Sequence, residues 1–293
     1  MLIPYQVDVP MERWPISNFV ILGLMPIPFF LPFFLCQFMS EDRIAEIFVA
    51  FLLYGWSAGG LLGHMWLHIG LGHLLGNMLF LWLFGNAVCA KVGNGRYPFV
   101  YLSLGIIAAA THLIADGSPA VGASGAINGI VGMYVVMYPL NSISCFFGIF
   151  PWIRQFSLSG IWLILLWFLF DLWGAASGGE GIAYIAHIGG FTAGVLLAAF
   201  MLKSRLVEMN ETERSLLEIL GVPIGSPEHT AAGAVADRLE EERASLGAPA
   251  AQEGTMQFRC ACGKVVKTSI KNAGMNARCP ACKKMIRIPM PDE

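Results

Sequence analysis

One serine and one histidine stand out in this 293-residue chain, because each lies in an apolar segment among small residues. Ser124 belongs to GASG, residues 122–125, and His187 belongs to AHIGGFTAG, residues 186–194. A serine hydroxyl paired with an imidazole can act as a nucleophile, with the imidazole as its general base. Taken singly, such a serine more often bonds a carbonyl one turn back, and such a histidine more often packs helices. The chemistry therefore depends on whether the two side chains meet.

A second polar cluster lies upstream, in HMWLHIGLGHLLGN, residues 64–77. His73 and Asn77 are four residues apart, so on a helix they share one face about a turn apart. Two such side chains can converge on one small group. His64 and His68 lie in the same stretch, four residues apart.

Glycines next to the serine and the histidine suggest how the two helices approach each other. Gly125 and Gly129 form one pair with small-xxx-small spacing, and Gly190 and Gly194 form another. Faces of this kind let helix backbones come close. If the two faces meet, the imidazole comes within hydrogen-bonding reach of the hydroxyl. Generic helix packing remains the alternative for either pair alone.

The elements that must position these residues are membrane helices. Hydrophobic residues make up 56% of the chain and charged residues 13%, and the mean hydropathy is +0.63, which is too apolar for an ordinary soluble domain. Six segments are long enough to cross about 30 Å of hydrocarbon. They are residues 17–38, 69–90, 97–115, 120–139, 156–177 and 182–202. A seventh apolar stretch, 44–63, is broken by glycines and is expected to be an interfacial loop.

Basic residues in the short loops predict the orientation. They follow the second, fourth and sixth spans, as Lys91, Arg96, Arg154, Lys203 and Arg205. Both termini are then cytoplasmic, and the end of the fourth span that carries the serine faces outward. The first 16 residues contain charged side chains and no cleavage site follows the first apolar segment, so no cleavable signal peptide is expected.

The composition changes after residue 203. Residues 203–256 carry ten acidic and five basic residues, whereas 257–293 carry eight basic and two acidic. The basic part contains two close cysteine pairs sixteen residues apart: Cys260, Cys262, Cys279 and Cys282. Four thiolates with such spacing suit tetrahedral zinc, and the stretch resembles a zinc ribbon. Two disulfides are the alternative, which a reducing cytoplasmic location disfavours.

Together, the membrane motifs resemble those of the rhomboid family of intramembrane serine proteases. The family pattern HxxxHxxxxHxxxN is matched by His64, His68, His73 and Asn77, GxSG by Gly122 to Gly125, and AHxxGxxxG by Ala186, His187, Gly190 and Gly194. The three motifs occur in the family order and cover roughly residues 15–203. The tail lies outside the resemblance.

The resemblance implies roles for these residues. Ser124 would be the nucleophile and His187 its general base, a dyad without an aspartate. His73, Asn77 and the Ser124 backbone N–H would form the oxyanion hole, whose donors stabilise the oxyanion that forms when an amide is attacked. His64 and His68 would be supporting residues, which we expect to hold the loop and the second span through hydrogen bonds. Catalysis would need no cofactor, and zinc would be structural and confined to the tail.

The chain also departs from the family pattern. Gly59 and Gly60 stand near the place where many relatives carry a Trp-Arg pair, and Cys89 stands where a glutamate is expected. Asn128 replaces the aromatic ring that lies against the histidine in some relatives. The first two changes affect loop anchoring, and the third leaves open how the imidazole is oriented.

The sequence therefore predicts an all-α polytopic membrane protein in four parts. These are an N-terminal cytoplasmic segment (1–16), a six-span rhomboid-like protease domain (17–203), an acidic, partly helical connector (204–256) and a zinc-ribbon-like domain (257–293). The expected function is endoproteolysis of transmembrane segments of other proteins, in a bacterial inner membrane. The alternative is an inactive rhomboid-like protein that binds client transmembrane helices. A transporter is disfavoured because few ionisable groups lie in the spans.

The basic tail has three candidate partners. We favour a cytoplasmic protein partner, with anionic lipid as an alternative and nucleic acid as the least favoured of the three. A ribbon on the cytoplasmic side cannot reach chemistry near the outer face of the membrane.

Overall fold

A computed structural model describes most of the chain. The described residues are 2–149, 152–179, 181–210, 213–222, 224, 255–269, 276–279, 281–282 and 284–289. The chain divides into two compact units, Met1–Ile224 and Gly225–Glu293. Most of the expected acidic connector, residues 225–254, lies outside the described residues, and its predicted boundaries stay a prediction.

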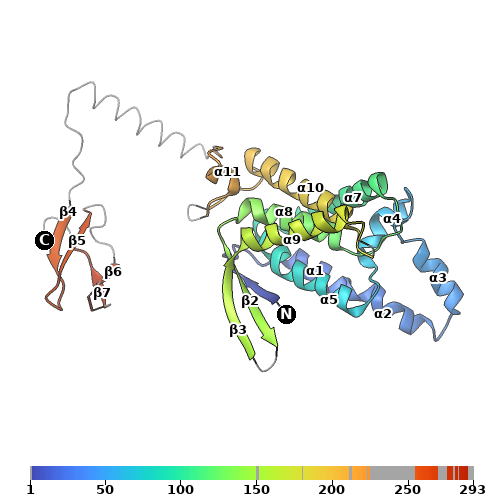
Figure 1. Cartoon of the computed structure of the whole chain (residues 1–293), viewed down its shortest axis with the longest axis horizontal. Coiled ribbons are helices and arrows are strands. Elements are labelled where there is room, and N and C mark those ends of the chain that lie inside the picture. Colours follow the sequence, from blue (N-terminus) through green and yellow to red (C-terminus); the bar gives the residue numbers. More distant parts are fainter. Residues whose placement is uncertain are drawn as a thin grey trace, which may run out of the picture. The chain divides into compact units, whose positions relative to one another are not determined.

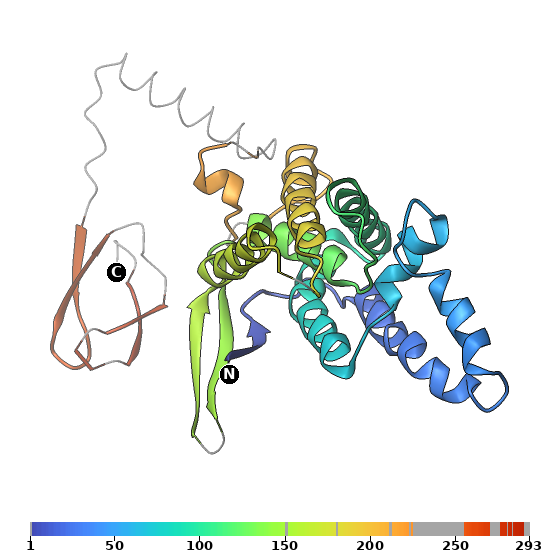
Figure 2. The ribbon, with the colours of Figure 1, turned by 45° about the vertical axis from the view of Figure 1, so that its right-hand side comes forward.

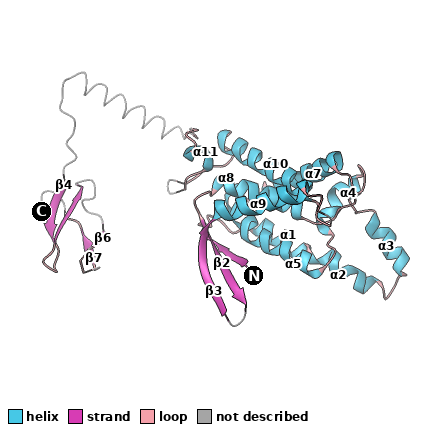
Figure 3. Cartoon of the chain, in the orientation of Figure 1, coloured by secondary structure: helices cyan, strands magenta, loops and turns pink. Residues whose placement is uncertain are grey.

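The first unit is built mainly of helices (Figure 1, Figure 3). In chain order they are α1 Ile16–Leu24, α2 Pro26–Leu35, α3 Glu41–Val49, α4 Ala58–Gly63, η1 His64–Trp66, α5 Leu71–Phe80, η2 Leu81–Gly85, α6 Asn86–Val92, α7 Tyr97–Ala115, α8 Ser124–Met137, α9 Gly160–Ala176, α10 Tyr184–Lys203 and α11 Leu216–Ile219. Here η1 is a 3-10 turn, and η2 is a π-helical turn that joins α5 to α6.

Apolar helices occupy all six places where spans are expected. In the part of the chain that the structure describes, four are long and apolar enough to cross a membrane by length and composition: Ile16–Leu35, Leu71–Val92, Tyr97–Ala115 and Tyr184–Lys203. The other two, α8 and α9, are apolar but shorter. The stretch 44–63 contributes to α3 and α4, which have nine and six residues and are too short to cross at about 1.5 Å per residue.

Helices α8 and α10 touch backbone to backbone at the glycines. A Cβ atom at Gly190 would collide with the carbonyl oxygen of Gly125, and one at Gly194 would collide with that of Gly129. On the same side of α8, Cβ atoms at Gly125 and Gly129 would press on side chains of α7. The meeting of the two glycine faces, expected from their spacing, is therefore present.

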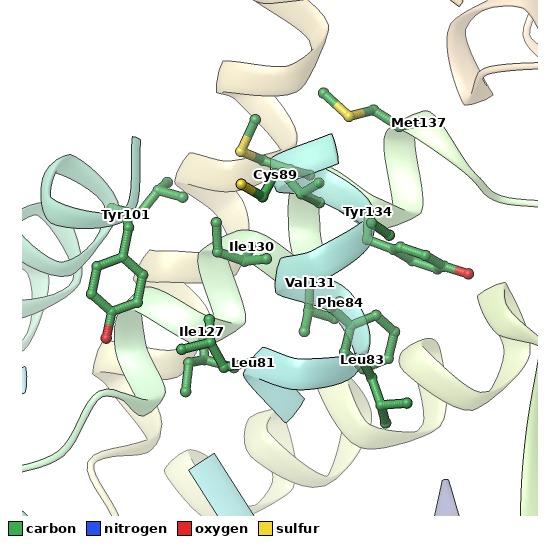
Figure 4. Packing of buried hydrophobic residues seen from close by; sticks show 14 of the residues in the cluster. Leu81, Leu83, Phe84, Cys89, Tyr101, Ile127, Ile130, Val131, Tyr134 and Met137 are labelled. Atoms are coloured by element: carbon green, nitrogen blue, oxygen red, sulfur yellow. The ribbon is translucent and has the colours of Figure 1, made fainter. Parts of the chain in front are cut away.

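The other side of α8 packs on the second span. Figure 4 shows Ile130, Val131 and Tyr134 of α8 beside Leu81 and Phe84 of η2. The Phe84 and Tyr134 rings meet edge to face, with centroids 4.9 Å apart. All five side chains are at most 4% exposed, so α8 is the buried centre of the bundle, clamped between α7, α10 and η2.

A three-stranded antiparallel sheet, which the sequence analysis does not predict, lies in the same unit. Its strands are β1 Leu2–Val7, β2 Ser142–Ile149 and β3 Trp152–Ser159, in the order β1-β2-β3. Residues 142–149 alternate in the manner of a strand, because Ile143 and Cys145 are fully buried whereas Ser142 and Ser144 are not. The fifth helix therefore begins at Gly160 and not at residue 156 as expected.

Loops at the sheet end of the bundle are tied together by charges. Lys91 Nζ donates to Glu12 and to Glu213, the latter at 2.6 Å, and the Asn210 amide also donates to Glu12. Arg96 donates to the Leu206 carbonyl at 2.8 Å. The N-terminal segment, the loop after the second span and the residues after α10 are thus held at one end.

The second unit contains two hairpins. Strands β4 Thr255–Arg259 and β5 Val265–Ser269 form one, and β6 Asn276–Arg278 and β7 Met285–Arg287 form the other. Each hairpin carries one of the two cysteine pairs at its turn. Strands are drawn in magenta in Figure 3.

Candidate active site

Ser124 and His187 meet at the end of the bundle opposite the sheet. Ser124 is the first residue of α8, and His187 lies in the first turn of α10. Because the glycine faces bring the two helices into backbone contact, Ser124 Oγ lies 2.8 Å from His187 Nε2. Figure 2 shows α8 and α10 side by side, as in Figure 1. This distance is a hydrogen bond of the kind that activates a serine.

The other imidazole nitrogen faces a carboxylate. His187 Nδ1 lies 3.1 Å from Asp171 Oδ1 of α9, and the two side chains are 13% and 16% exposed. The dyad that the resemblance implies does not include this carboxylate. Asp171, His187 and Ser124 form one hydrogen-bonded chain across three helices.

The GASG turn brings the second polar cluster against the serine. Gly122 has a φ of +121°, which L side chains rarely adopt. A Cβ atom at this position would lie 2.7 Å from His73 Nε2 and 3.8 Å from Asn77 Nδ2. Only glycine therefore allows the turn to come this close to the imidazole and the amide, which accounts for the first glycine of the motif.

Donors around Ser124 are free to bind a further group. Asn77 is 7% exposed, and its Nδ2 has no hydrogen-bond partner among the described residues. The Ser124 backbone N–H starts a helix, where N–H groups lack partners within the helix. Leaving a buried donor unpaired costs free energy, so the arrangement suits an acceptor that is not part of the chain.

His64 and His68 support this region in different ways. His64 Nδ1 lies 2.8 Å from the Gly60 carbonyl, and the His64 carbonyl accepts the Gly122 N–H at 2.8 Å, which fixes the turn. The His68 ring packs on the edge of the His73 ring, with centroids 5.2 Å apart. Burial, and to a smaller extent the charge of a protonated His73, lower the pKa of His68 to about 4, so His68 is neutral at neutral pH.

The departures from the family pattern find local explanations. Asn128 Nδ2 donates to the Ser124 carbonyl at 3.0 Å and does not orient the imidazole. An aromatic ring comes instead from Tyr184, one turn before His187, at a distance of 6.4 Å between the ring centroids.

The two departures in the loops also have local contacts. Cys89 is buried and its thiol donates to Asn94. A Cβ atom at Gly59 or Gly60 would strike the 50–52 backbone, so this loop packs too tightly for side chains there.

Asp171 is the residue that sequence reasoning missed. It is the single ionisable residue of α9, and an ionisable residue inside an apolar span is by default a candidate for function. It lies near the end of α9, and His187 lies near the start of α10. The end of one span and the start of the next meet at the same face of a membrane, so this pattern could have indicated the contact.

The four tail cysteines also come together. Their sulfur atoms all lie within 4.8 Å of one another, with Cys260 and Cys282 3.9 Å apart and Cys262 and Cys279 3.8 Å apart. Zinc–sulfur bonds of about 2.3 Å in a tetrahedron place sulfurs roughly 3.8 Å apart, whereas a disulfide needs about 2.05 Å. The four thiols could therefore hold one metal ion.

Two thiols of this cluster, Cys260 and Cys279, have pKa values shifted in opposite directions. Backbone N–H groups of Cys282 and Ala281 lower the pKa of Cys279 to about 6. The N–H of Cys262 lowers the pKa of Cys260, but desolvation and hydrogen bonds to the other three thiols outweigh it and raise the pKa to about 11. Metal binding needs thiolates, so Cys279 offers a thiolate at neutral pH, whereas a cation would have to displace the proton of Cys260.

Comparison with known proteins identifies the class. A model of the rhomboid domain matches residues 55–204, slightly more than half of the chain and the whole region that holds Ser124 and His187. The chain belongs to the rhomboid family. With its apolar helices, it is an integral membrane protein.

Several rhomboid proteins are similar to this chain. Rhomboid protease GluP of Bacillus subtilis is 36% identical in an alignment of 118 residues that covers 36% of this chain and 23% of that protein. Rhomboid protein 1, mitochondrial, of Saccharomyces cerevisiae is 28% identical over 53% of this chain and 44% of its own length. Rhomboid protease GlpG of Klebsiella pneumoniae is 27% identical over 46% of this chain and 45% of its own length. The chain thus spans less than half the length of these relatives.

Proposed function

We propose that this chain is an intramembrane serine endopeptidase that cleaves transmembrane segments of other proteins. The observation that carries the proposal is the 2.8 Å contact between Ser124 Oγ and His187 Nε2, beside the buried Asn77 Nδ2, which has no hydrogen-bond partner among the described residues. The protease names of the GluP and GlpG relatives support the same activity.

Each step of amide hydrolysis has a group in place. Ser124 Oγ attacks the scissile carbonyl while its proton passes to His187 Nε2. The oxyanion then accepts hydrogen bonds from Asn77 Nδ2, the His73 imidazole and the Ser124 N–H. His187 returns the proton to the leaving amine, whose C–N bond breaks to leave an acyl-enzyme. A water molecule, deprotonated by His187, hydrolyses the ester and regenerates the serine.

The proposed orientation places the site toward the outer face of a bacterial inner membrane, with both termini cytoplasmic. Basic residues gather in the loops at the other end of the bundle, and positive loops stay inside. Pairing of β1 with β2, and of Arg96 with the Leu206 carbonyl, supports a common side for the N-terminus and the residues after α10.

Cleavage requires the substrate helix to unwind so that its carbonyl reaches Ser124. Helix-breaking residues lower the cost of unwinding, by about 1 kcal/mol for glycine and about 3 kcal/mol for proline relative to alanine. We therefore expect substrates with Gly, Pro or small residues near the cut site, and resistance in an all-leucine transmembrane segment.

The experiment is cleavage of a model transmembrane protein by the purified chain in proteoliposomes. Wild type should cleave a segment that contains Gly and Pro, and Ser124→Ala should not. Ser103→Ala, which removes an exposed serine of α7, is the matched control and should cleave like wild type. If folded wild type does not cleave but captures the segment, the chain is instead a rhomboid-like protein that binds client helices.

For the tail, we propose a structural zinc held by Cys260, Cys262, Cys279 and Cys282 in a zinc-ribbon-like domain that docks a cytoplasmic protein. The sulfur spacing supports the metal, and a domain of this size lacks the apolar core to fold alone. Purified full chain should contain one zinc per molecule by mass spectrometry under native conditions. Cys279→Ser should lose it, whereas Cys36→Ser, at an exposed cysteine of the first unit, should keep it. Zinc in equal amounts in both variants would refute the site.

A further inference from the structure

Asp171 extends the hydrogen-bonded chain that joins Ser124 to His187. Its Oδ1 lies 3.1 Å from His187 Nδ1, and His187 Nε2 lies 2.8 Å from Ser124 Oγ. The three residues come from α9, α10 and α8 in turn. Each imidazole nitrogen therefore has one partner, a carboxylate on one side and the serine hydroxyl on the other.

Asp171 lies in an apolar helix, and His187 is the one side-chain partner found for it among the described residues. It is the single ionisable residue among the seventeen of α9, whose other residues are apolar or small. No other hydrogen bond and no other ion pair of its side chain is found within the described ranges. A carboxylate in an apolar span is costly, and here its compensation comes from the His187 imidazole.

The contact would settle the proton positions on His187. A carboxylate only accepts hydrogen bonds, so Nδ1 must carry a hydrogen to donate to Asp171. In the neutral ring this leaves Nε2 as the acceptor that faces the Ser124 hydroxyl. When Nε2 takes the serine proton, the ring becomes an imidazolium, which the neighbouring negative charge stabilises.

We infer that Asp171 is a positioning residue of the active site, which holds His187 in the tautomer that accepts the proton of Ser124 and stabilises the imidazolium. This inference rests on the proposed protease function. It replaces the dyad that the family resemblance implies with a carboxylate–imidazole–hydroxyl triad in which Asp171 exchanges no proton.

The test is the kinetics of Asp171→Asn and Asp171→Ala in proteoliposomes with the model substrate. Asparagine keeps the volume, but its amide group can donate to Nδ1 and hold the wrong tautomer. We expect kcat to fall roughly 10²- to 10⁴-fold, with KM changed less than about twofold because Asp171 does not reach the substrate. Asp116→Asn, at a half-exposed aspartate at the same end of the bundle, is the matched control and should keep wild-type kcat.

A conservative variant separates positioning from a structural role. The groups that face His187 are Asp171 of α9, Ser124 of α8, His73 of α5 and Tyr184 of its own helix, while α7 presents the uncharged Thr111 to the adjoining Gly189. Of these, Asp171 alone carries a carboxylate that can accept the hydrogen of His187 Nδ1. Asp171→Glu keeps such an acceptor, so it should recover part of the kcat that Asp171→Asn and Asp171→Ala lose.

The outcomes distinguish this inference from the proposed function. Wild-type kcat in folded Asp171→Asn would overturn the inference and leave the protease intact. A kcat of Asp171→Glu no higher than that of Asp171→Ala would also overturn it, since the loss would then not depend on the carboxylate. Absence of cleavage by wild type, or cleavage by Ser124→Ala, would instead refute the proposed function.

Discussion

The two ends of the helical bundle use buried polar groups in opposite ways. At the sheet end, the Lys91 ammonium is 1% exposed and paired with the carboxylates of Glu12 and Glu213. At the serine end, the Asn77 amide is also buried, but its Nδ2 has no hydrogen-bond partner among the described residues. The first arrangement joins parts of the chain to each other, whereas the second leaves a donor for a group from outside.

This difference indicates that the sheet end contributes mainly to stability and the serine end mainly to the reaction. Removal of one member of a buried ion pair leaves the other charge without compensation, so it should lower the free energy of unfolding. An unpaired buried donor costs stability, so its loss should affect only the reaction that uses it. Substitutions at the two ends should therefore separate the free energy of unfolding from kcat.

The largest loss of stability is expected for Lys91→Met. Methionine keeps much of the volume but leaves the buried Glu213 carboxylate and the partly exposed Glu12 carboxylate without a cation, which should lower the free energy of unfolding by about 3–5 kcal/mol. Titration with denaturing detergent measures this loss, and cleavage per folded molecule should stay at the wild-type level. Arg43→Met breaks the exposed Arg43–Glu46 pair and should cost less than about 1 kcal/mol. Equal losses in the two variants would contradict the comparison.

Asn77→Ala should show the reverse pattern. Removal of one oxyanion donor should lower kcat roughly 10²- to 10³-fold, equivalent to about 3–4 kcal/mol of transition-state stabilisation. Because Nδ2 has no partner in the described structure, the free energy of unfolding should not fall. A loss of stability without a loss of kcat would assign Asn77 to the fold and remove it from the oxyanion hole.

Gly194→Ala should affect both quantities, since Gly194 lies in the helix contact that brings the dyad together. The added Cβ collides with the Gly129 carbonyl, which should cost about 1–3 kcal/mol and lower kcat by moving His187 away from Ser124. Gly76→Ala is the matched control, because a Cβ there meets nothing within 4 Å. Thermal unfolding in mild detergent and cleavage assays on both variants test the contrast.

The smallest effect is expected at His68, and it depends on pH. The folded protein holds the pKa of His68 near 4, against about 6.5 in the unfolded chain. Above pH 6.5 neither state is protonated; between 6.5 and 4 the unfolded state binds a proton that the folded state does not, so stability falls. His68→Gln should lose less stability than wild type over this range. An identical pH dependence of the unfolding midpoint would contradict the assignment.

Local spacing predicted those parts of the site that are close in sequence or built on short contacts. The four-residue interval placed His73 and Asn77 on one face, and the two glycine pairs predicted that α8 and α10 touch. Such patterns depend only on helix periodicity and on the absence of side chains, which the sequence displays directly. The structure adds the φ of Gly122 and the Cβ collision with His73 as reasons for the motif.

Contacts between distant segments were not predictable in the same way. The sequence could indicate that Asp171 and His187 lie at the same face of the membrane, but their contact also depends on the rotation at which α9 and α10 pack, which one aspartate in an apolar helix does not specify. Lys91 was read as a loop charge, although it is buried between Glu12 and Glu213, which lie far from it in the chain. The strand Ser142–Ile149 falls in the loop expected between the fourth and fifth spans, and the last four residues of β3 were assigned to the fifth span, because a short alternating segment beside long helices gives a weak signal.

The most direct test of the account is covalent labelling with a fluorophosphonate probe, which reacts with activated serines. Purified wild type, Ser124→Ala and His187→Ala would be labelled in mild detergent and the adduct located by peptide mass spectrometry. The account predicts one adduct, on Ser124 of wild type, and none in either variant. Labelling of Ser124→Ala to the wild-type level, or no adduct on folded wild type, would contradict the claim that His187 activates Ser124.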